Sequence, residues 1–232
     1  MIKWFLFDGY GTLLNAGKEN IPWLASKMEI KYNLPADLIF KFWSNGYFTL
    51  ERQFKNEFMT IMQANRISLS YAFGSLGLPI KDVESWMQQL IHFWSYPDLY
   101  DGITELFDDL QTNNPYVQFG VISNTDEDTI LNAINHSHLP ISFVMSSERA
   151  KHYKPDPKIF TLSLQELKIE ASECIYIGNS VSDIVGAERA FIPCIYLNRD
   201  NKKLPNRYSH IPIVPDTQEL RRHLRNLNYY LP

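Results

Sequence analysis

The sequence has little of what crosslinking or membrane insertion requires. Its 232 residues include only two cysteines, Cys174 and Cys194, which form no CxxC pair and each lie beside an apolar run. The expected state is therefore a pair of reduced thiols in a protein core. No apolar run approaches the roughly 18 residues that a membrane-spanning helix needs. The run after Lys3 stops at Asp8, which is too short for a secretory signal peptide.

The chain also lacks a strong excess of either positive or negative charge. The net charge is −4, there is no large basic block, and the aromatic residues do not lie among clustered Lys or Arg. Nucleic-acid binding is therefore not expected. Together these absences predict a cytoplasmic protein with neither a membrane nor a nucleic acid as partner. Its oligomeric state, monomer or homodimer, stays open at this point.

Hydrophobic residues, by contrast, make up 45% of the chain, enough for a substantial core. They form short continuous runs, and from Gly102 onward amphipathic helical patterns separate them. Apolar strands that alternate with helices predict an α/β fold with a Rossmann-like parallel sheet covered by helices on both faces. The expected strands are 2–7, 117–122, 141–145, 174–178, 193–197 and 211–215.

Residues 16–98 show a different pattern. They read as helical throughout, with Trp and Phe at helical spacing and no strand-like run. Such a block between the first strand and the rest predicts an all-helical cap domain inserted into the sheet protein. The expected domains are therefore a core of residues 1–15 and 99–232 and a cap of residues 16–98.

Four successive expected strands end in polar side chains. Ligands of open parallel sheets bind outside the carboxyl ends of the strands, so these side chains are the candidates for a site. Any one group alone is an ordinary turn, cap or surface charge, but four in order indicate chemistry. The groups are Asp8 and Tyr10; Ser123, Asn124 and Asp126; Arg149, Lys151 and Lys154; and Asn179, Ser180, Ser182 and Asp183.

The residue types suggest how such a site would work. Asp8 is ionised at neutral pH and can attack an electrophilic carbon or phosphorus to form an ester. Gly9 lets backbone amides approach an anion, and Ser123 and Asn124 precede a helix where an anionic substrate can be held. Lys154 can neutralise both Asp8 and the substrate. Asp183, one turn into the helix after the fourth strand, can hold a metal, hold the lysine or activate water.

These segments together resemble the haloacid dehalogenase-like (HAD) hydrolase superfamily. FDGYGTLLN, VISNTD, HYKPDPKIF and YIGNSVSDIVGA resemble its four motifs in order, and the resemblance covers essentially the whole chain. It implies that Asp8 is a covalent nucleophile and that Thr12 supports its loop. It further implies that Ser123 and Asn124 bind the substrate anion, Lys154 balances the charge of Asp8, and Asp183 serves a metal or the hydrolytic water.

Two departures concern the phosphatases of the superfamily. They carry an Asp as general acid two residues after the nucleophile, where this chain has Tyr10, and a phenol is a poor proton donor at neutral pH. They often show Gly-Asp where this chain has Gly178-Asn179. A Mg²⁺ site made by Asp8, the Tyr10 carbonyl, Asn179 and Asp183 is still expected, with weaker binding than a full phosphatase site.

The Asp-x-Tyr-Gly-Thr form of the first motif instead resembles the 2-haloacid dehalogenases, whose halide leaving group needs no proton. Those enzymes resemble one another in an Arg after a cap Trp and in a Tyr six residues after the lysine. Here Ser44 follows Trp43, and Phe160 stands at the second position. Arg52 is the candidate to replace that Arg as an anion ligand. Ser180 is the candidate for part of the role of the fourth motif of those enzymes.

The sequence therefore leaves three functions open, each on a small anionic substrate or ligand. The leading expectation is a Mg²⁺-assisted, phosphatase-like hydrolase that forms an ester on Asp8. The first alternative is metal-independent displacement of halide from a 2-haloacid. The second is a catalytically vestigial member that binds a ligand or partner.

Overall fold

The computed structural model describes residues 2–15, 20–53 and 57–226, without the side chains of residues 20 and 47–53. The chain divides into two compact units. Residues 1–15 and 98–232 form the core unit, and residues 16–97 form the helical unit. Each unit has its own hydrophobic interior, so each is described by itself.

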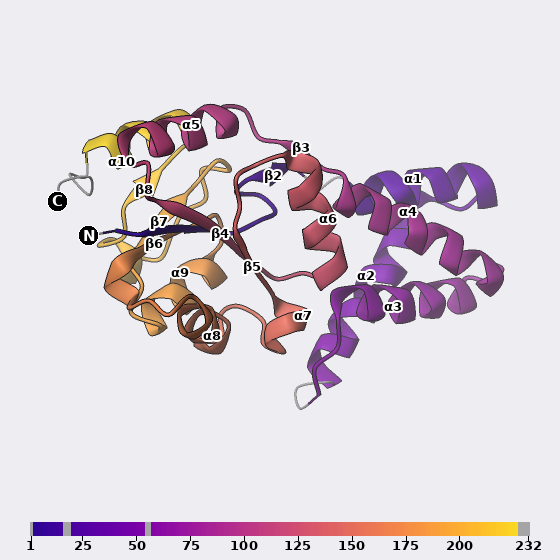
Figure 1. Ribbon diagram of the computed structural model, residues 1–232. Helices are drawn as coiled ribbons and strands as arrows, with labels where there is room; N and C mark the ends of the chain where they lie inside the picture. Colours follow the sequence, from indigo (N-terminus) through magenta and orange to yellow (C-terminus); the bar gives the residue numbers. More distant parts are fainter. Residues whose placement is uncertain (1, 16–19, 54–56, 227–232) are drawn as a thin grey trace. The chain divides into compact units, whose positions relative to one another are not determined.

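The core unit is built on a six-stranded parallel sheet with the order β5-β4-β1-β6-β7-β8 (Figure 1). The parallel α/β fold that the sequence predicts is confirmed. β1 pairs with β4 on one side and β6 on the other, which places the end of β1 in the middle of the sheet. The strands are β1 (Trp4–Phe7), β4 (Gln118–Ser123), β5 (Phe143–Ser146), β6 (Cys174–Gly178), β7 (Cys194–Leu197) and β8 (Ile213–Val214).

Alternate side chains of each strand serve opposite faces of this sheet. Phe5 and Phe7 join a cluster with residues of α5, α6 and α10, whereas Trp4 and Leu6 join another with residues of α8 and α9. Figure 1 shows α5 and α10 side by side over one face and α8 and α9 on the other. The helices are α5 (Ile103–Asn113), α6 (Glu127–Ser137), α7 (Ser147–Ala150), α8 (Pro157–Leu167), α9 (Val181–Arg189) and α10 (Thr217–Asn226), with 3₁₀ turns η2 (Ala171–Glu173) and η3 (Asn206–Tyr208).

The structure corrects several element boundaries. β1 begins at Trp4 rather than residue 2, and Ser123 is the last residue of β4 rather than the first after it. A short antiparallel ribbon of β2 (Leu14–Asn15) and β3 (Asp98–Leu99) was not predicted. Each of its strands is two residues long, and the two strands are separated by more than 80 residues of sequence. Local periodicity therefore does not indicate them.

The helical unit contains α1 (Asn20–Tyr32), α2 (Ala36–Gln53), α3 (Ile61–Ser75), the 3₁₀ turn η1 (Ile80–Asp82) and α4 (Val83–Ser95). Its described residues contain no strand. Leu24, Met28, Trp43, Phe73 and Leu90 are at most 1% exposed and belong to one cluster. The aromatic residues at helical spacing therefore serve first to hold these helices together.

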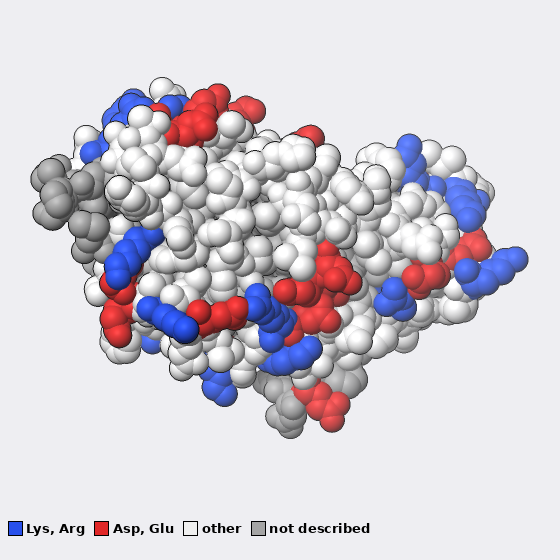
Figure 2. Space-filling model, in the orientation of Figure 1, with Lys and Arg blue, Asp and Glu red and all other residues white. Residues whose placement is uncertain are grey.

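Two surface properties bear on possible partners. Within the described parts of the chain, no helix is long and apolar enough to cross a membrane. Acidic and basic side chains are interspersed on the face shown in Figure 2, in keeping with the small net charge of −4. Interspersed charges of both signs are typical of a protein surface in water.

Candidate active site

Lys154 lies between two carboxylates beyond the carboxyl ends of β1 and β6. Its Nζ is 2.6 Å from Asp8 Oδ1 and 2.6 Å from Asp183 Oδ1. The same atom lies 3.1 Å from the carbonyl oxygen of Ile122 and 3.0 Å from the hydroxyl oxygen of Tyr176, so four acceptors surround its three N–H groups. Asp8, Lys154 and Asp183 are 6%, 5% and 2% exposed, so the three charges interact out of water. The motifs that the sequence singled out are thus brought into one buried ion network.

A tight loop holds Asp8 at the end of β1. The Asp8 N–H donates to the Ile177 carbonyl at 2.8 Å, and the Gly9 carbonyl accepts from the N–H groups of Leu13 and Leu14 at 2.9 and 3.0 Å. Gly11 turns the chain with φ +89°, a conformation that a residue with a Cβ rarely adopts. Thr12 Oγ1 donates to Asp8 Oδ2 at 3.2 Å, which matches its expected support of this loop. Residues 8–14, which carry the nucleophile that the sequence predicts, are called the nucleophile loop below.

Both carboxylate oxygens of Asp183 accept hydrogen bonds. Oδ1 accepts from Lys154 at 2.6 Å and from Tyr176 at 2.8 Å. Oδ2 accepts from the N–H of Asn179 at 3.2 Å, the N–H of Ser180 at 2.9 Å and Ser180 Oγ at 2.6 Å. Ser180 is the N-cap of α9, and Asp183 is at position N3 of the same capping box. One carboxylate therefore caps the helix and pairs with the lysine at the same time.

Burial and the neighbouring charges shift the pKa values of Asp8, Asp183 and Lys154. Burial raises the pKa of Asp8 to about 6, although Lys154 opposes the shift. Burial also works against ionisation of Asp183, but Lys154 and the hydrogen bonds from Ser180 and Tyr176 hold the pKa of that carboxyl below its ordinary value. The two carboxylates keep the pKa of Lys154 above its usual range despite burial. At neutral pH the network therefore consists of two carboxylates and one ammonium.

Tyr10 does not take the place of a general acid. Burial, with the nearby negative charges of Asp8 and Asp126, raises the pKa of its phenol above the ordinary value. A weaker acid donates a proton to a leaving group less readily. The position that carries the acid in superfamily phosphatases is therefore even less suited to that role here than the sequence suggests.

The second motif contributes in two different ways. A Cβ on Gly9 would lie 3.1 Å from Ser123 Oγ, so the Ser123 hydroxyl lies beside the nucleophile loop. The Asn124 amide faces elsewhere: its Oδ1 accepts from the N–H of Lys154 at 2.7 Å, and its Nδ2 donates to the Lys154 carbonyl at 3.1 Å. The structure thus shows the Asn124 side chain hydrogen-bonded to the backbone of Lys154, and its expected role in substrate binding stays a prediction.

Comparison with known proteins agrees with this arrangement. A family model described as haloacid dehalogenase-like hydrolase matches residues 42–197, which include Lys154 and Asp183. The chain belongs to the haloacid dehalogenase-like hydrolase family. Membership makes it a hydrolase. Asp8 lies outside the matched span, so its assignment depends on the geometry above.

Several known proteins are similar over nearly the whole chain. The (S)-2-haloacid dehalogenase 1 of Pseudomonas sp. strain CBS-3 is 24% identical over 219 residues, covering 91% of this chain and 90% of the relative. The L-2-haloacid dehalogenase of Xanthobacter autotrophicus, solved with covalently bound chloropropionic acid, is 19% identical with a TM-score of 0.72, covering 98% of this chain and 100% of that one. A magnesium-bound HAD-hydrolase of Bacillus subtilis is 21% identical with a TM-score of 0.73, covering 97% and 99%. At these identities, the solved structures show the fold.

Within this family member the residues expected to hold Mg²⁺ do not fit the ion. The two oxygens of Asp183 already accept five hydrogen bonds, and a carboxylate offers about four lone-pair sites. A Cβ on Gly11 would lie 2.1 Å from Asn179 Nδ2, so the Asn179 amide is packed against the turn. The described residues also contain no group of three His, Cys, Asp or Glu side chains that could hold a metal. The expectation of Mg²⁺ is therefore not supported.

The remaining sequence candidates have mixed outcomes. The side chain of Arg52 lies outside the described residues, so its expected role stays a prediction. Trp43 is 1% exposed and belongs to the interior of the helical unit. Ser44 donates to the Lys41 carbonyl at 3.2 Å within α2. Phe160 is fully buried, and its ring meets that of Tyr176 edge-on with centroids 4.9 Å apart.

Tyr176 is the site residue that sequence reasoning missed. It lies inside an apolar strand, where an aromatic residue is ordinary core, yet its hydroxyl reaches Lys154, Asp183 and the Ile122 carbonyl. Burial and the negative charges of Asp183 and Asp8 raise the pKa of this phenol well above its ordinary value, so it stays protonated and donates. The available signal was a single polar atom in the run CIYIG.

Removing this hydroxyl should loosen the ion network. We expect Tyr176→Phe to lower the free energy of unfolding by about 2 kcal/mol, because Asp183 and Lys154 each lose a buried hydrogen-bond partner. Denaturant titration followed by tryptophan fluorescence measures the change. Tyr196→Phe is the matched control, since Tyr196 is a tyrosine of the neighbouring strand β7 that is only 1% exposed. Equal losses in the two variants would contradict a specific role for Tyr176.

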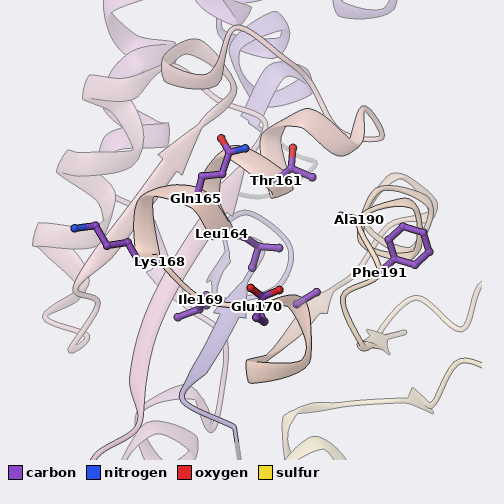
Figure 3. Close-up of a pocket in the computed structure, with 9 residues that line it drawn as sticks. Thr161, Leu164, Gln165, Lys168, Ile169, Glu170, Ala190 and Phe191 are labelled. Carbon is purple, nitrogen blue, oxygen red and sulfur yellow. The ribbon is translucent and has the colours of Figure 1, made fainter.

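An open depression of the core unit lies away from this site. It has a volume of about 660 Å³ and is bordered by α8, η2 and the end of α9, with Phe191 at its rim (Figure 3). Because η2 immediately precedes β6, this depression lies at the amino end of that strand, whereas Asp8 and Asp183 follow carboxyl ends. This depression is therefore separate from the buried ion network of Asp8, Lys154 and Asp183.

Proposed function

We propose that this protein is a 2-haloacid dehalogenase that displaces halide from a short 2-haloalkanoate through a covalent ester on Asp8. The observation that carries this proposal is the Asp8–Lys154–Asp183 network without a proton donor at Tyr10. Halide leaves as a stable anion and needs no proton, whereas the alkoxide of a phosphate ester does. The similarity to (S)-2-haloacid dehalogenases supports this alternative over the phosphatase-like one.

In the first step, Asp8 attacks carbon 2 of the substrate. Oδ1 is held by Lys154 at 2.6 Å, while Oδ2 carries the longer 3.2 Å hydrogen bond from Thr12. Oδ2 is therefore the attacking atom in our proposal. A new C–O bond forms as the carbon–halogen bond breaks, and the negative charge of Asp8 leaves with the halide. Lys154 then remains balanced by Asp183, so no unpaired charge is buried in the ester state.

In the second step, water attacks the carbonyl carbon of the Asp8 ester. The Lys154 ammonium lies beside Oδ1, where negative charge develops in the tetrahedral intermediate, and stabilises it. The 2-hydroxy acid and a proton are released, and Asp8 is regenerated. Asp183 was a candidate base for the water. Since both of its oxygens are fully hydrogen-bonded, we assign it to holding Lys154 in place.

Halide release from the two enantiomers of 2-chloropropionate tests this proposal. We expect chloride release that is unaffected by EDTA and that prefers the (S)-enantiomer, with (R)-lactate as product because displacement inverts carbon 2. A single turnover in ¹⁸O-water should label Asp8 rather than the product, since water attacks the carbonyl carbon of the ester. Absence of halide release, together with Mg²⁺-dependent hydrolysis of p-nitrophenyl phosphate, would contradict this proposal and favour the phosphatase-like function.

Protonation of Asp8 at low pH should reduce the rate of halide release. The pKa of Asp8 is raised to about 6, so the carboxylate becomes protonated as the pH falls through that value. We expect kcat/KM for halide release to fall about tenfold for each pH unit below about 6, since only the ionised form attacks. A pH–rate profile measured with one substrate in buffers of constant ionic strength gives the apparent pKa. A flat profile between pH 5 and 8 would contradict the assignment.

A further inference from the structure

Arg199 reaches the nucleophile loop from outside all four motifs. It follows β7 by two residues, so it lies at the same carboxyl edge of the sheet as Asp8 and Asp183. Its Nη1 donates to the Gly11 carbonyl at 2.7 Å, and its Nη2 donates to Thr217 Oγ1 at 2.8 Å. Both arms of the guanidinium fork are thus used, one of them on the loop that carries the nucleophile.

The part of the loop that Arg199 holds is its turning point. Gly11 has φ +89°, and its N–H donates to the Leu14 carbonyl at 2.9 Å, which closes the turn. Asn179 packs against Gly11 so closely that a Cβ would lie 2.1 Å from its Nδ2. Gly11 is therefore contacted by Asn179 at its α-carbon and by Arg199 at its carbonyl.

Arg199 also contacts the segment that returns to the core unit. Its guanidinium carbon lies 4.0 Å from the centroid of the Tyr100 ring, within cation–π range. The N–H of Tyr100 in turn donates to the Leu13 carbonyl at 3.1 Å, next to the pairing of Leu14 with Leu99. One side chain thus holds both the outgoing β2 end and the returning β3 end of the ribbon.

We propose that Arg199 is a positioning residue for the displacement reaction, one that keeps the nucleophile loop in the conformation from which Asp8 attacks. Asp8 is three residues from Gly11, and the hydrogen bonds from Leu13 and Leu14 to the Gly9 carbonyl couple the two ends of the loop. A shift at Gly11 therefore moves the carboxylate. Misplacement of a reacting group by about 1 Å costs about 100-fold in rate. The kinetic part of this inference depends on the proposed function.

The kinetic test compares Arg199→Met with the wild type in halide release. We expect kcat to fall about 100-fold with KM changed less than about threefold, because the loop is displaced while substrate binding is retained. Millimolar guanidinium chloride, far below denaturing concentrations, should restore at least about tenfold of the lost kcat by occupying the vacated position. Methylammonium chloride at the same concentration should not, since it lacks the planar fork.

A matched variant and a conservative one complete the set. Arg207→Met removes another arginine that stacks on a tyrosine, 4.7 Å from the centroid of the Tyr208 ring, but this arginine is exposed and belongs to η3. It should leave kcat unchanged. Arg199→Lys keeps the charge but has a single donor atom in place of the planar fork, so its kcat should fall between those of the wild type and Arg199→Met. It also serves as the test variant if Arg199→Met does not fold.

Hydrogen exchange provides a readout that is independent of activity. Loss of Arg199 should speed amide exchange in the peptide that contains Gly11, Leu13 and Leu14, with other core strands unchanged. Faster exchange there in a protein that releases no halide would overturn the proposed function and keep the loop-holding role. Unchanged kcat, a loss without guanidinium rescue, or unchanged loop exchange would each overturn the positioning role.

Discussion

Asp8→Asn is expected to abolish turnover while the protein remains folded. An amide cannot form the ester, so kcat for halide release should fall by about 10⁴-fold or more. The fold should survive because Lys154 keeps its contact with Asp183 at 2.6 Å and therefore does not become an unpaired buried charge. Replacing a buried carboxylate whose pKa is raised by burial also removes a desolvation cost.

Chloride release and intact-mass spectrometry together measure this effect. The wild type, quenched during turnover with 2-chloropropionate, should carry the added mass of a 1-carboxyethyl group, and Asp8→Asn should not. Asp101→Asn, a change to an exposed aspartate of the same unit, should behave as the wild type in both assays. Covalent adduct formation by Asp8→Asn would mean that another residue is the nucleophile.

The second large effect is expected from Lys154→Met. Two carboxylates, each now 2.6 Å from Nζ, would be left buried without a counter-charge. Breaking a buried ion pair in this way costs about 3–5 kcal/mol, so the melting temperature should fall by about 10 °C at neutral pH. Activity should be lost as well, since the ammonium both orients Asp8 and stabilises the tetrahedral intermediate.

The pH dependence of that loss has a definite sign. Without Lys154, the pKa of both Asp8 and Asp183 in the folded state lies above the unfolded value, so the folded state binds protons more readily. Stability is then present at low pH and is lost as pH rises through the raised values. We expect the deficit relative to the wild type to be larger at pH 8 than at pH 5.

Thermal unfolding across this pH range measures the difference. Lys158→Met removes an exposed lysine in the first turn of α8 and should cost little stability at either pH. Adding Asp8→Asn to Lys154→Met should recover part of the stability, because one of the two unpaired charges is gone. A deficit that is the same at pH 5 and pH 8 would show that lost packing, rather than the uncompensated carboxylates, is responsible.

The sequence predicted the α/β class because its signals are local. Runs such as CIYIG are continuous and apolar, as strands buried on both faces must be, and the amphipathic helices between them require covered faces. The same rule that places ligands at carboxyl strand ends selected Asp8, Lys154 and Asp183, which the structure brings within 2.6 Å contacts. The β2–β3 ribbon escaped prediction because its partners are adjacent only after folding.

Residue types did not reveal which atoms meet. Asn124 has the chemistry of a substrate ligand, and the structure shows that its amide also makes two hydrogen bonds to the backbone of Lys154. Tyr176 has the chemistry of a core residue, yet its hydroxyl joins the ion network. Arg199 follows a fifth strand that carried no recognised motif, although the carboxyl-end rule applies to that strand as well.

The sequence by itself determined the class of fold, the nucleophile candidate and the resemblance to the haloacid dehalogenase-like hydrolases, because these depend on residue types, their order and local periodicity. Only the tertiary structure decided how the charges are used. It filled both oxygens of Asp183 with hydrogen bonds, placed Lys154 between two carboxylates and raised the pKa of Tyr10 by burial. Those outcomes depend on distances of a few ångströms between groups far apart in the chain, and they are what favours halide displacement over metal-assisted phosphate hydrolysis.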